Sequence, residues 1–406
     1  MSTPQRAGPH SLVHLALSLN WRSHEARHSE VRHVPRFNVW RDLDLLPPPL
    51  RHAILDHAPG DCAAFPFEAG RVVPSRRQDA VHELPATAFV PGAGTELEPR
   101  EGRFYPRGML RGLPGVFRGD MRPARLVGRD GDRLRLDLNH PLAGLPLEVS
   151  LRVVDVAAAP VEHGGRCDDA LEALTEGPGL QARYGGRPTD FYADAPWARA
   201  DERPDAEFYR TPRMVSHLDA TARAQLEALH RTLLPPGGRV LDLMASWDSH
   251  LEGVECAAVA GLGLNAAELE ANPRLGLRLC HDLNSEPVLP FGEAVFDAVV
   301  CTAAVEYLIQ PAAVFREVAR VLRPGGLFLV TFSNRWFPPK AIRLWGALHE
   351  FERLGLVSDY FLASGRFADL HTRSLRGLPR PADDPHLAQT ALSDPLYAVW
   401  AWRDPD

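Results

Sequence analysis

The sequence predicts two domains of different class: an N-terminal α+β domain dominated by strands, and a C-terminal α/β domain with a mostly parallel, doubly wound sheet. Its 406 residues are two to three times a usual domain length. Residues 134–156 contain two apolar alternating segments and no helical pattern. After residue 238 strand-like and helix-like segments alternate, which is typical of α/β proteins. We therefore expect domains at residues 10–158 and 205–406, joined by a connector at 159–204.

Composition narrows the class of protein. The formal net charge is -7 and the pI about 6.2, which argues against broad binding of nucleic acid. No stretch reaches the ~18 apolar residues of a membrane span, and the short apolar patch near the N-terminus is a poor signal peptide. Five scattered cysteines without CxxC pairing indicate reduced thiols and no zinc site. We expect a cytoplasmic protein with no metal and no membrane partner.

The N-terminal half begins with an apolar strand at residues 14–21. The His- and Arg-rich segment that runs on to Asn38 is expected to be a surface loop, and its His24, His28 and His33 to be solvated. Residues 45–60 predict a short helix that starts at prolines, and a strand follows. Residues 157–205 are rich in Gly, Asp, Pro and Arg with little periodicity, which indicates a connector.

The C-terminal half has a regular order. Residues 217–234 have apolar residues at helical spacing, Pro235-Pro236-Gly237-Gly238 ends that helix, and GRVLDLM follows as a buried strand. AAVAGLGL, AELEANPRL, FDAVVCTAA, AAVFREVARVL and LFLVTFSN then alternate as strand and helix. In such a sheet, ligands bind at the carboxyl ends of the strands, so the residues just after the strands are the candidate site.

Four motifs in this order resemble class I S-adenosylmethionine-dependent methyltransferases. They are VLDL at 240–243, HD at 281–282 with LPF at 289–291, FDAV at 296–299, and EVARVLRPGG at 317–326. The final DPLYAVWAWR is similar to the last strand of that family. LDLMASW resembles a methyltransferase type 11-like family whose first motif is poor in glycine. The resemblance implies a Rossmann-like fold for residues 205–406 and S-adenosyl-L-methionine as cofactor.

The resemblance also implies a set of cofactor-binding residues. Asp242 would bond near the methionine end, and the backbone of Ala245 and Ser246 would approach the cofactor. Asp282 would accept the adenine amino proton beside Leu283, although an Asx turn is an alternative role for Asp282 and a strand-end cap for Asp242. The acidic residue that usually receives both ribose hydroxyls is replaced by Gly263. Asn265 is then either a weaker ribose partner or the N-cap of the next helix.

The methyl acceptor side is less defined by sequence, because displacement at a sulfonium requires positioning and a deprotonated acceptor rather than one universal residue. His250 and Tyr307 follow the first and fourth strands and are the candidate catalytic residues, with ordinary packing as the alternative. Residues expected to form a lid or line an acceptor cleft, or else to pack against the core, are Phe208, Tyr209, Arg213, His217, Trp336, Lys340 and Trp345.

The N-terminal half has a resemblance of its own. DLNHPLAG at 137–144, followed by LPLEVSLRVVDV, resembles the closing strands of SlyD-type FKBP prolyl isomerases, and HELPATAFVP at 82–91 is similar to the entry of their inserted flap domain. The tyrosine of their A-Y-G turn is missing, because Ala69 runs directly to Gly70. The resemblance implies an FKBP-like domain at residues 10–158 that binds substrate or isomerises prolines.

Together these expectations describe a two-domain methyltransferase whose acceptor is unknown, with a protein or peptide as one candidate. The alternative is a non-catalytic binding or chaperone-like scaffold in which both sites have decayed, because side chains of residues 244–247 would crowd a close backbone approach to the cofactor.

Overall fold

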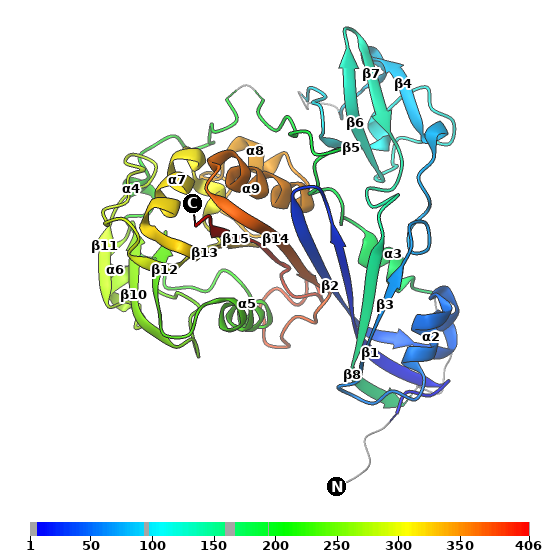
Figure 1. Ribbon diagram of the computed structural model, residues 1–406, viewed down its shortest axis with the longest axis horizontal. Coiled ribbons are helices and arrows are strands. Elements are labelled where there is room, and N and C mark those ends of the chain that lie inside the picture. Colours follow the sequence, from blue (N-terminus) through cyan, green and yellow to red (C-terminus); the bar gives the residue numbers. More distant parts are fainter. Residues whose placement is uncertain (1–5, 93–96, 159–166, 194, 406) are drawn as a thin grey trace. The chain divides into compact units, whose positions relative to one another are not determined.

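The computed structural model describes residues 6–92, 97–158, 167–193 and 195–405. The chain divides into two compact units, the first comprising residues 1–194 and 349–355, and the second residues 195–348 and 356–406 (Figure 1). The predicted boundaries at 158 and 205 differ from this division. Parts of the predicted connector, residues 159–166 and 194, lie outside the described residues.

The N-terminal unit contains two antiparallel sheets. The first has the order β2-β1-β8-β3, and the second, four-stranded sheet has the order β4-β7-β6-β5. The chain leaves the first sheet after β3, forms the second, and returns in β8. The bounds are β1 Ser11–Arg22, β2 Ala26–Asn38, α1 Val39–Asp42, η1 Leu43–Leu45, α2 Pro48–Ile54, β3 Cys62–Phe67, η2 Gln78–Ala80, β4 Val81–Pro85, η3 Ala86–Ala88, β5 Phe104–Pro106, η4 Arg107–Met109, β6 Pro123–Asp130, β7 Arg133–Asp137, β8 Leu147–Ala158 and α3 Ala170–Thr175.

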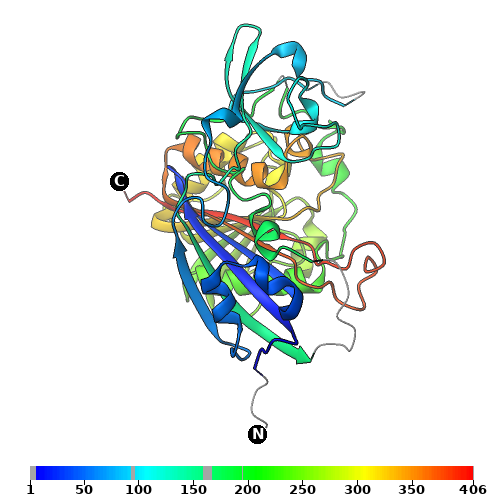
Figure 2. The same cartoon turned by 90° about the vertical axis from the view of Figure 1, so that its right-hand side faces the viewer.

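One apolar core supports the first sheet. Alternate residues of β1 and β8, such as Leu17 and Val149, are fully buried, as expected for strands with one covered face. Figure 2 shows α2, in blue, packed on this sheet, and its Leu50 and Ile54 belong to the same core. Helix α3 adds Leu174 to that core, so its part of the predicted connector is folded into the N-terminal unit.

The predicted loop before Asn38 is wrong, because these residues form β2. Polar side chains occupy several buried positions of β2 and make specific contacts there, so the sequence lacks the alternating apolar pattern that predicts a strand. The His28 ring stacks on Trp21 with centroids 3.8 Å apart, the His33 ring Nδ1 lies 3.0 Å from His14 Nε2, and Glu30 accepts a hydrogen bond from Gln181 at 2.8 Å. The expectation that His28 and His33 are solvated is therefore also wrong.

The C-terminal unit is the expected doubly wound α/β structure. Its strands have the order β11-β10-β9-β12-β13-β15-β14; pairs from β11 to β13 are parallel, and β15 pairs antiparallel with β13 and β14. The bounds are α4 Asp205–Phe208, α5 Ala220–Leu233, β9 Gly238–Leu243, β10 Cys256–Gly263, α6 Ala266–Ala271, β11 Leu277–Cys280, β12 Phe296–Thr302, η5 Val305–Tyr307, α7 Pro311–Val321, β13 Leu322–Phe332, α8 Arg343–Gly346, α9 Glu350–Ser364, β14 Phe367–Arg376 and β15 Leu396–Arg403.

This strand order creates the place for a ligand. Strand β9 lies between β10 and β12, so the chain crosses to one side of β9 for β10 and to the other for β12. The carboxyl ends of these strands border the crevice where open α/β sheets bind ligands. The residues that follow β9, β10, β11 and β12 therefore face a common region.

Candidate cofactor and acceptor site

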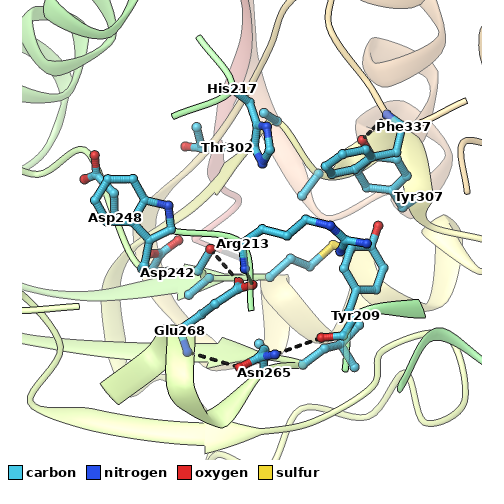
Figure 3. Close-up of a pocket in the computed structure, with 18 of the residues that line it drawn as sticks. Tyr209, Arg213, His217, Asp242, Asp248, Asn265, Glu268, Thr302, Tyr307 and Phe337 are labelled. Atoms are coloured by element: carbon cyan, nitrogen blue, oxygen red, sulfur yellow. Dashed lines mark hydrogen bonds between the residues drawn. The ribbon is translucent and has the colours of Figure 1, made fainter. Parts of the chain in front are cut away.

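A cavity lies at the carboxyl ends of β9, β10 and β12, bordered by residues of the 205–218 segment (Figure 3). Every residue that the sequence analysis selected as cofactor-binding or catalytic lines it. These residues are Asp242, Ala245, Ser246, His250, Asn265, Asp282, Leu283 and Tyr307. Tyr209, Arg213 and His217, three of the expected lid residues, line it as well.

Asp242, in strand β9, places a buried carboxyl group in this cavity. Its side chain is 4% exposed, and its Oδ2 has no hydrogen-bond partner among the described residues. Burial raises the pKa of Asp242 to about 7, against the opposing effect of a hydrogen bond from Ser249. A ligand cation that reached this carboxyl would find an unused acceptor whose ionised form it stabilises.

The glycine-poor turn after β9 adopts a conformation that usually favours glycine. Met244 has φ +61°, in the left-handed region where side chains are uncommon. The Ala245 amide donates to the Leu262 carbonyl at 2.8 Å, and the Asn272 side chain donates to the Ser246 carbonyl at 2.8 Å. The turn is thus anchored to β10 and to the end of α6, and Ala245 and Ser246 still border the cavity.

Gly263 ends β10 where an acidic residue was expected. A Cβ atom at this position would lie 2.1 Å from the Ala245 carbonyl oxygen, so the turn after β9 occupies the space of any side chain there. The absence of an acid at 263 is therefore a structural requirement of this chain.

Asn265 is the N-cap of α6. Its Oδ1 accepts hydrogen bonds from the Ala267 and Glu268 amides at 3.0 and 3.2 Å. Its Nδ2 donates to the Tyr209 and Arg210 carbonyls at 2.8 and 3.1 Å, so both amide hydrogens are used. Of its two predicted roles, the structure shows the cap.

Asp282 and Leu283 lie in the loop after β11. The Asp282 Oδ1 accepts a hydrogen bond from the Asn284 amide at 2.9 Å, which is the Asx turn considered from the sequence. Its second carboxyl oxygen accepts no hydrogen bond from the residues that the structure describes, and Leu283 beside it is buried. An acceptor next to an apolar surface suits a flat heterocycle with an amino group.

Aromatic rings gather on another side of the cavity. Tyr209, Tyr307 and Phe337 have ring centroids 6.2 to 6.5 Å apart, and the Arg213 guanidinium lies 5.3 Å from the Phe337 centroid. The Tyr307 hydroxyl accepts a hydrogen bond from the Phe337 amide at 2.8 Å, and burial raises the pKa of Tyr307 well above its usual value. The Tyr209 hydroxyl is buried without a hydrogen-bond partner in the described part of the chain.

His250 follows the turn after β9 at φ +52°. Its Nδ1 lies 3.2 Å from Asp248 Oδ2, and its amide donates to Asp248 Oδ1 at 2.8 Å. A carboxylate in this position orients an imidazole ring. Both side chains line the cavity.

Three expected cleft residues do not line the cavity. Lys340 and Trp345 are fully buried; the Lys340 Nζ lies 2.9 Å from Asp205 Oδ1, and Trp345 packs edge-on against Phe332. Trp336 is also outside the cavity, whereas its neighbour Phe337 lines it. Phe337 and Glu268 line the cavity but were not predicted from the sequence. For Glu268 a signal was available, because it is an acidic residue in the first turn of the helix that follows the second strand of this unit.

Comparison with known proteins finds similar methyltransferases. Residues 244–330 match the family described as "Methyltransferase domain". The chain is 28% identical over 142 residues to a ubiquinone biosynthesis O-methyltransferase of Xanthomonas axonopodis pv. citri, covering 32% of this chain and 57% of that protein. It is 35% identical over 101 residues to a demethylmenaquinone methyltransferase of Mycobacterium marinum, covering 23% and 41%. The chain thus spans about half the length of these curated relatives.

Among solved structures, an S-adenosylmethionine dependent methyltransferase from Mesorhizobium loti is similar, with a TM-score of 0.31 and 21% sequence identity. The match covers 43% of this chain and 96% of the Mesorhizobium loti chain. The C-terminal unit has a Rossmann-like α/β fold, and residues 244–330 within it match a methyltransferase domain. This match indicates S-adenosylmethionine as the cofactor.

The residues present fit that cofactor at two of its three parts. Asp242 supplies an unused buried acceptor for the methionine end, and Asp282 with Leu283 supplies an acceptor and an apolar surface for adenine. The position expected to bind ribose, Gly263, supplies no side chain. Within the described ranges, no helix is long and apolar enough to cross a membrane, and no group of three or more His, Cys, Asp or Glu residues could hold a metal ion.

Proposed function

We propose that the protein transfers a methyl group from S-adenosylmethionine to an acceptor bound in the same cavity. The observation that carries this proposal is the meeting of the predicted cofactor residues around one cavity, together with the orphaned carboxyl oxygen of Asp242. The sulfonium of the bound cofactor supplies an electrophilic methyl group. Asp242 would hold the amino group of the methionine end, the backbone of Ala245 and Ser246 would border it, and Asp282 and Leu283 would hold adenine.

The chain's own contribution to methyl transfer is positioning and proton removal. His250, oriented by Asp248 at 3.2 Å, would take the proton that the acceptor loses as its bond to the methyl carbon forms. Tyr307 keeps its proton in a buried environment, and its hydroxyl, fixed by the Phe337 amide at 2.8 Å, would orient the acceptor.

A protein or peptide acceptor is the first candidate, and the N-terminal unit supports it. Its helix α2 between β2 and β3, its second sheet inserted between β3 and β8, and its DLNHPLAG segment before β8 accord with a SlyD-like FKBP-type module. We propose that this unit binds polypeptides, with prolyl isomerisation a weaker expectation because the A-Y-G tyrosine is missing. A cytoplasmic location belongs to the same proposal.

A small aromatic hydroxyl compound is the second candidate acceptor. Two relatives carry the names ubiquinone biosynthesis O-methyltransferase and demethylmenaquinone methyltransferase. The rings of Tyr209, Tyr307 and Phe337 would pack against a planar acceptor. The two candidates differ in size, so a screen of hydroxylated aromatics and of peptides with labelled cofactor separates them.

The first experiment is calorimetric titration of the full chain with S-adenosylmethionine and S-adenosylhomocysteine. Micromolar binding is expected. Asp282→Asn keeps an oxygen for the turn to Asn284 but presents an amide donor to the adenine amino group, so we expect affinity to fall about tenfold. Glu293→Gln, a matched change at an exposed position of the same unit, should leave affinity unchanged. Absence of binding at millimolar ligand would favour a non-catalytic scaffold instead.

A further inference from the structure

The end of β10 has no room for the acidic residue that would receive the ribose hydroxyls. The Ala245 carbonyl oxygen occupies the place of a side chain at 263, and the Ala245 amide is bonded to Leu262 at 2.8 Å, which fixes that carbonyl near the strand. Asn265, the nearest polar alternative, already uses both amide hydrogens. A ribose acceptor must therefore come from another element.

Glu268 is placed to supply it. It lies in the first turn of α6, directly after β10, and Figure 3 shows its side chain extending from the helix into the cavity. Its Oε2 accepts a hydrogen bond from the Ser246 hydroxyl at 2.7 Å, and its Oε1 accepts one from the Arg213 amide at 2.8 Å. The carboxylate is thus held between the turn after β9 and the segment that borders the cavity.

Three other carboxylates of the cavity have different partners, and the fourth, Asp242, is the buried acceptor proposed for the methionine end. Asp205 lies 2.7 Å from Arg199 and 2.9 Å from Lys340, so two cations compensate it. Asp248 pairs with His250, and Asp282 holds its turn. Glu268 has no ion pair with any described Lys, Arg or His side chain, and the two groups that donate to it, the Ser246 hydroxyl and the Arg213 amide, are neutral.

We propose that Glu268 accepts the hydrogen bonds of the cofactor's two ribose hydroxyls, replacing the acidic residue that Gly263 excludes. A carboxylate is an acceptor with about four lone-pair sites, of which Ser246 and Arg213 use two. A vicinal diol offers two O–H donors, which matches the remaining capacity. This inference rests on the proposed binding of S-adenosylmethionine.

The same carboxylate ties ribose recognition to the segment that borders the cavity. Arg213, whose amide bonds to Glu268, also places its guanidinium over the rings of Phe208, Tyr209 and Phe337. The order of this aromatic side of the cavity therefore depends in part on Glu268.

The test compares Glu268→Gln with Glu270→Gln in the full-length protein. Glu270 lies on the same helix with an 81% exposed side chain, so its replacement removes the same charge outside the cavity. Dissociation constants are measured by calorimetry for S-adenosylhomocysteine, its 2′-deoxyribose analogue, and 5′-methylthioadenosine, which keeps the diol but lacks the amino acid. Thermal unfolding of each variant reports whether the unit stays folded.

Because hydrogen bonds to charged groups are the strong ones, Glu268→Gln should weaken S-adenosylhomocysteine and 5′-methylthioadenosine alike, by about 10- to 100-fold. The wild type should discriminate against the 2′-deoxy analogue by about tenfold, and Glu268→Gln should lose that discrimination. Glu270→Gln should behave as the wild type.

Three results would overturn the inference. The inference is overturned if the wild type binds the 2′-deoxy analogue as tightly as S-adenosylhomocysteine, and this result holds even if Glu268→Gln is unfolded. Discrimination that survives in a folded Glu268→Gln shows a structural role, and a loss restricted to S-adenosylhomocysteine assigns Glu268 to the amino acid end. A wild type that binds none of these ligands would instead contradict the proposed function itself.

Discussion

Asp242 combines two properties that rarely coexist in a folded protein: near-complete burial, and a carboxyl oxygen without a hydrogen-bond partner among the described residues. A buried carboxylate without a cationic partner is costly, so the group responds by holding its proton, and its pKa rises to about 7. In the unfolded chain the same carboxyl would titrate near 3.8. Between these two values the unfolded state has lost the proton and the folded state retains it.

This difference predicts how stability depends on pH. Because the unfolded state binds fewer protons, the free energy of unfolding of the wild type should fall as pH rises from about 4 to about 7, by at most about 4 kcal/mol from this residue. Asp242→Asn, a neutral isostere of the protonated acid, should lose that part of the pH dependence and be more stable than the wild type above pH ~7. Urea unfolding across this pH range measures it.

Asp297 provides the control with the opposite sign. Burial raises its pKa, but hydrogen bonds from the Arg239 amide and the Arg323 guanidinium bring the net pKa below its usual value. Its stabilisation should be present above pH ~4 and lost as pH falls, so Asp297→Asn should be destabilised at neutral pH. Equal pH profiles for the wild type and Asp242→Asn would contradict the assignment.

Residues of the site differed in how well sequence predicted them. Asp242 lies near the end of a strand of strong apolar pattern, so its position at the sheet edge could be predicted from chain order. Asp282 follows a short strand without such a pattern and was predicted only through the resemblance of its HD motif. Asn265 suited both a ribose partner and an N-cap. The carbonyls of Tyr209 and Arg210, which accept its two amide hydrogens, distinguish these roles and could not be predicted from the sequence. Glu268 and Phe337 were missed, because their place depends on how α6 and the segment after β13 fold back over the sheet.

At the scale of elements, the turn after β9 packs closely against the end of β10 because Gly263 has no side chain. Gly263→Ala should displace the turn or the strand, because its Cβ would meet a backbone oxygen at 2.1 Å that no rotamer change can move. We expect a loss of about 1–3 kcal/mol in the free energy of unfolding and weaker binding of S-adenosylhomocysteine.

Gly276→Ala is the matched control for this change. It precedes β11, and its Cβ would lie 3.7 Å from the Val259 carbonyl oxygen, an ordinary contact. Urea unfolding and calorimetry of both variants compare the two positions. A Gly263→Ala protein as stable as Gly276→Ala, with unchanged ligand affinity, would show that the turn after β9 yields without consequence.

Elements were predictable where apolar residues mark the buried face. Strands β9, β10, β12 and β13 and helices α6 and α7 follow the predicted order because their buried faces are apolar. Strand β11, which is short and has no buried residue, was not predicted as a strand. Strand β2 was not predicted, because its buried positions include His28, Glu30 and His33, whose contacts are with residues distant in the sequence. Helix α9 and strand β14 were not predicted. In β14 apolar, polar and charged residues follow one another without a regular pattern (FADLHTRSLR).

At the scale of the molecule, every residue that lines the cavity belongs to the C-terminal unit. The N-terminal unit has its own apolar core around β1 and β8, in which Leu17 is fully buried. Each unit thus has the internal contacts of an independent fold, and unfolding of the whole chain need not follow a two-state transition. Cofactor affinity and N-terminal stability should therefore respond to different substitutions.

Leu17→Ala tests this separation. Removing a fully buried leucine side chain leaves a cavity in the N-terminal core and should lower that unit's stability by about 2–5 kcal/mol. The affinity of the full chain for S-adenosylhomocysteine should stay within about twofold of the wild type, since the change leaves the cavity's lining intact. If the N-terminal unit presents polypeptide acceptors, methylation of peptides should decrease while binding of the cofactor does not.

Leu329→Ala, at a fully buried position of β13, makes the same chemical change in the C-terminal unit. There S-adenosylhomocysteine should offset part of the destabilisation, because a ligand that binds only the folded unit raises its unfolding temperature. The same ligand should leave the unfolding of the N-terminal unit in Leu17→Ala unprotected. Calorimetric scans of both variants with and without ligand distinguish the two, and equal protection of both would mean that the units unfold as one.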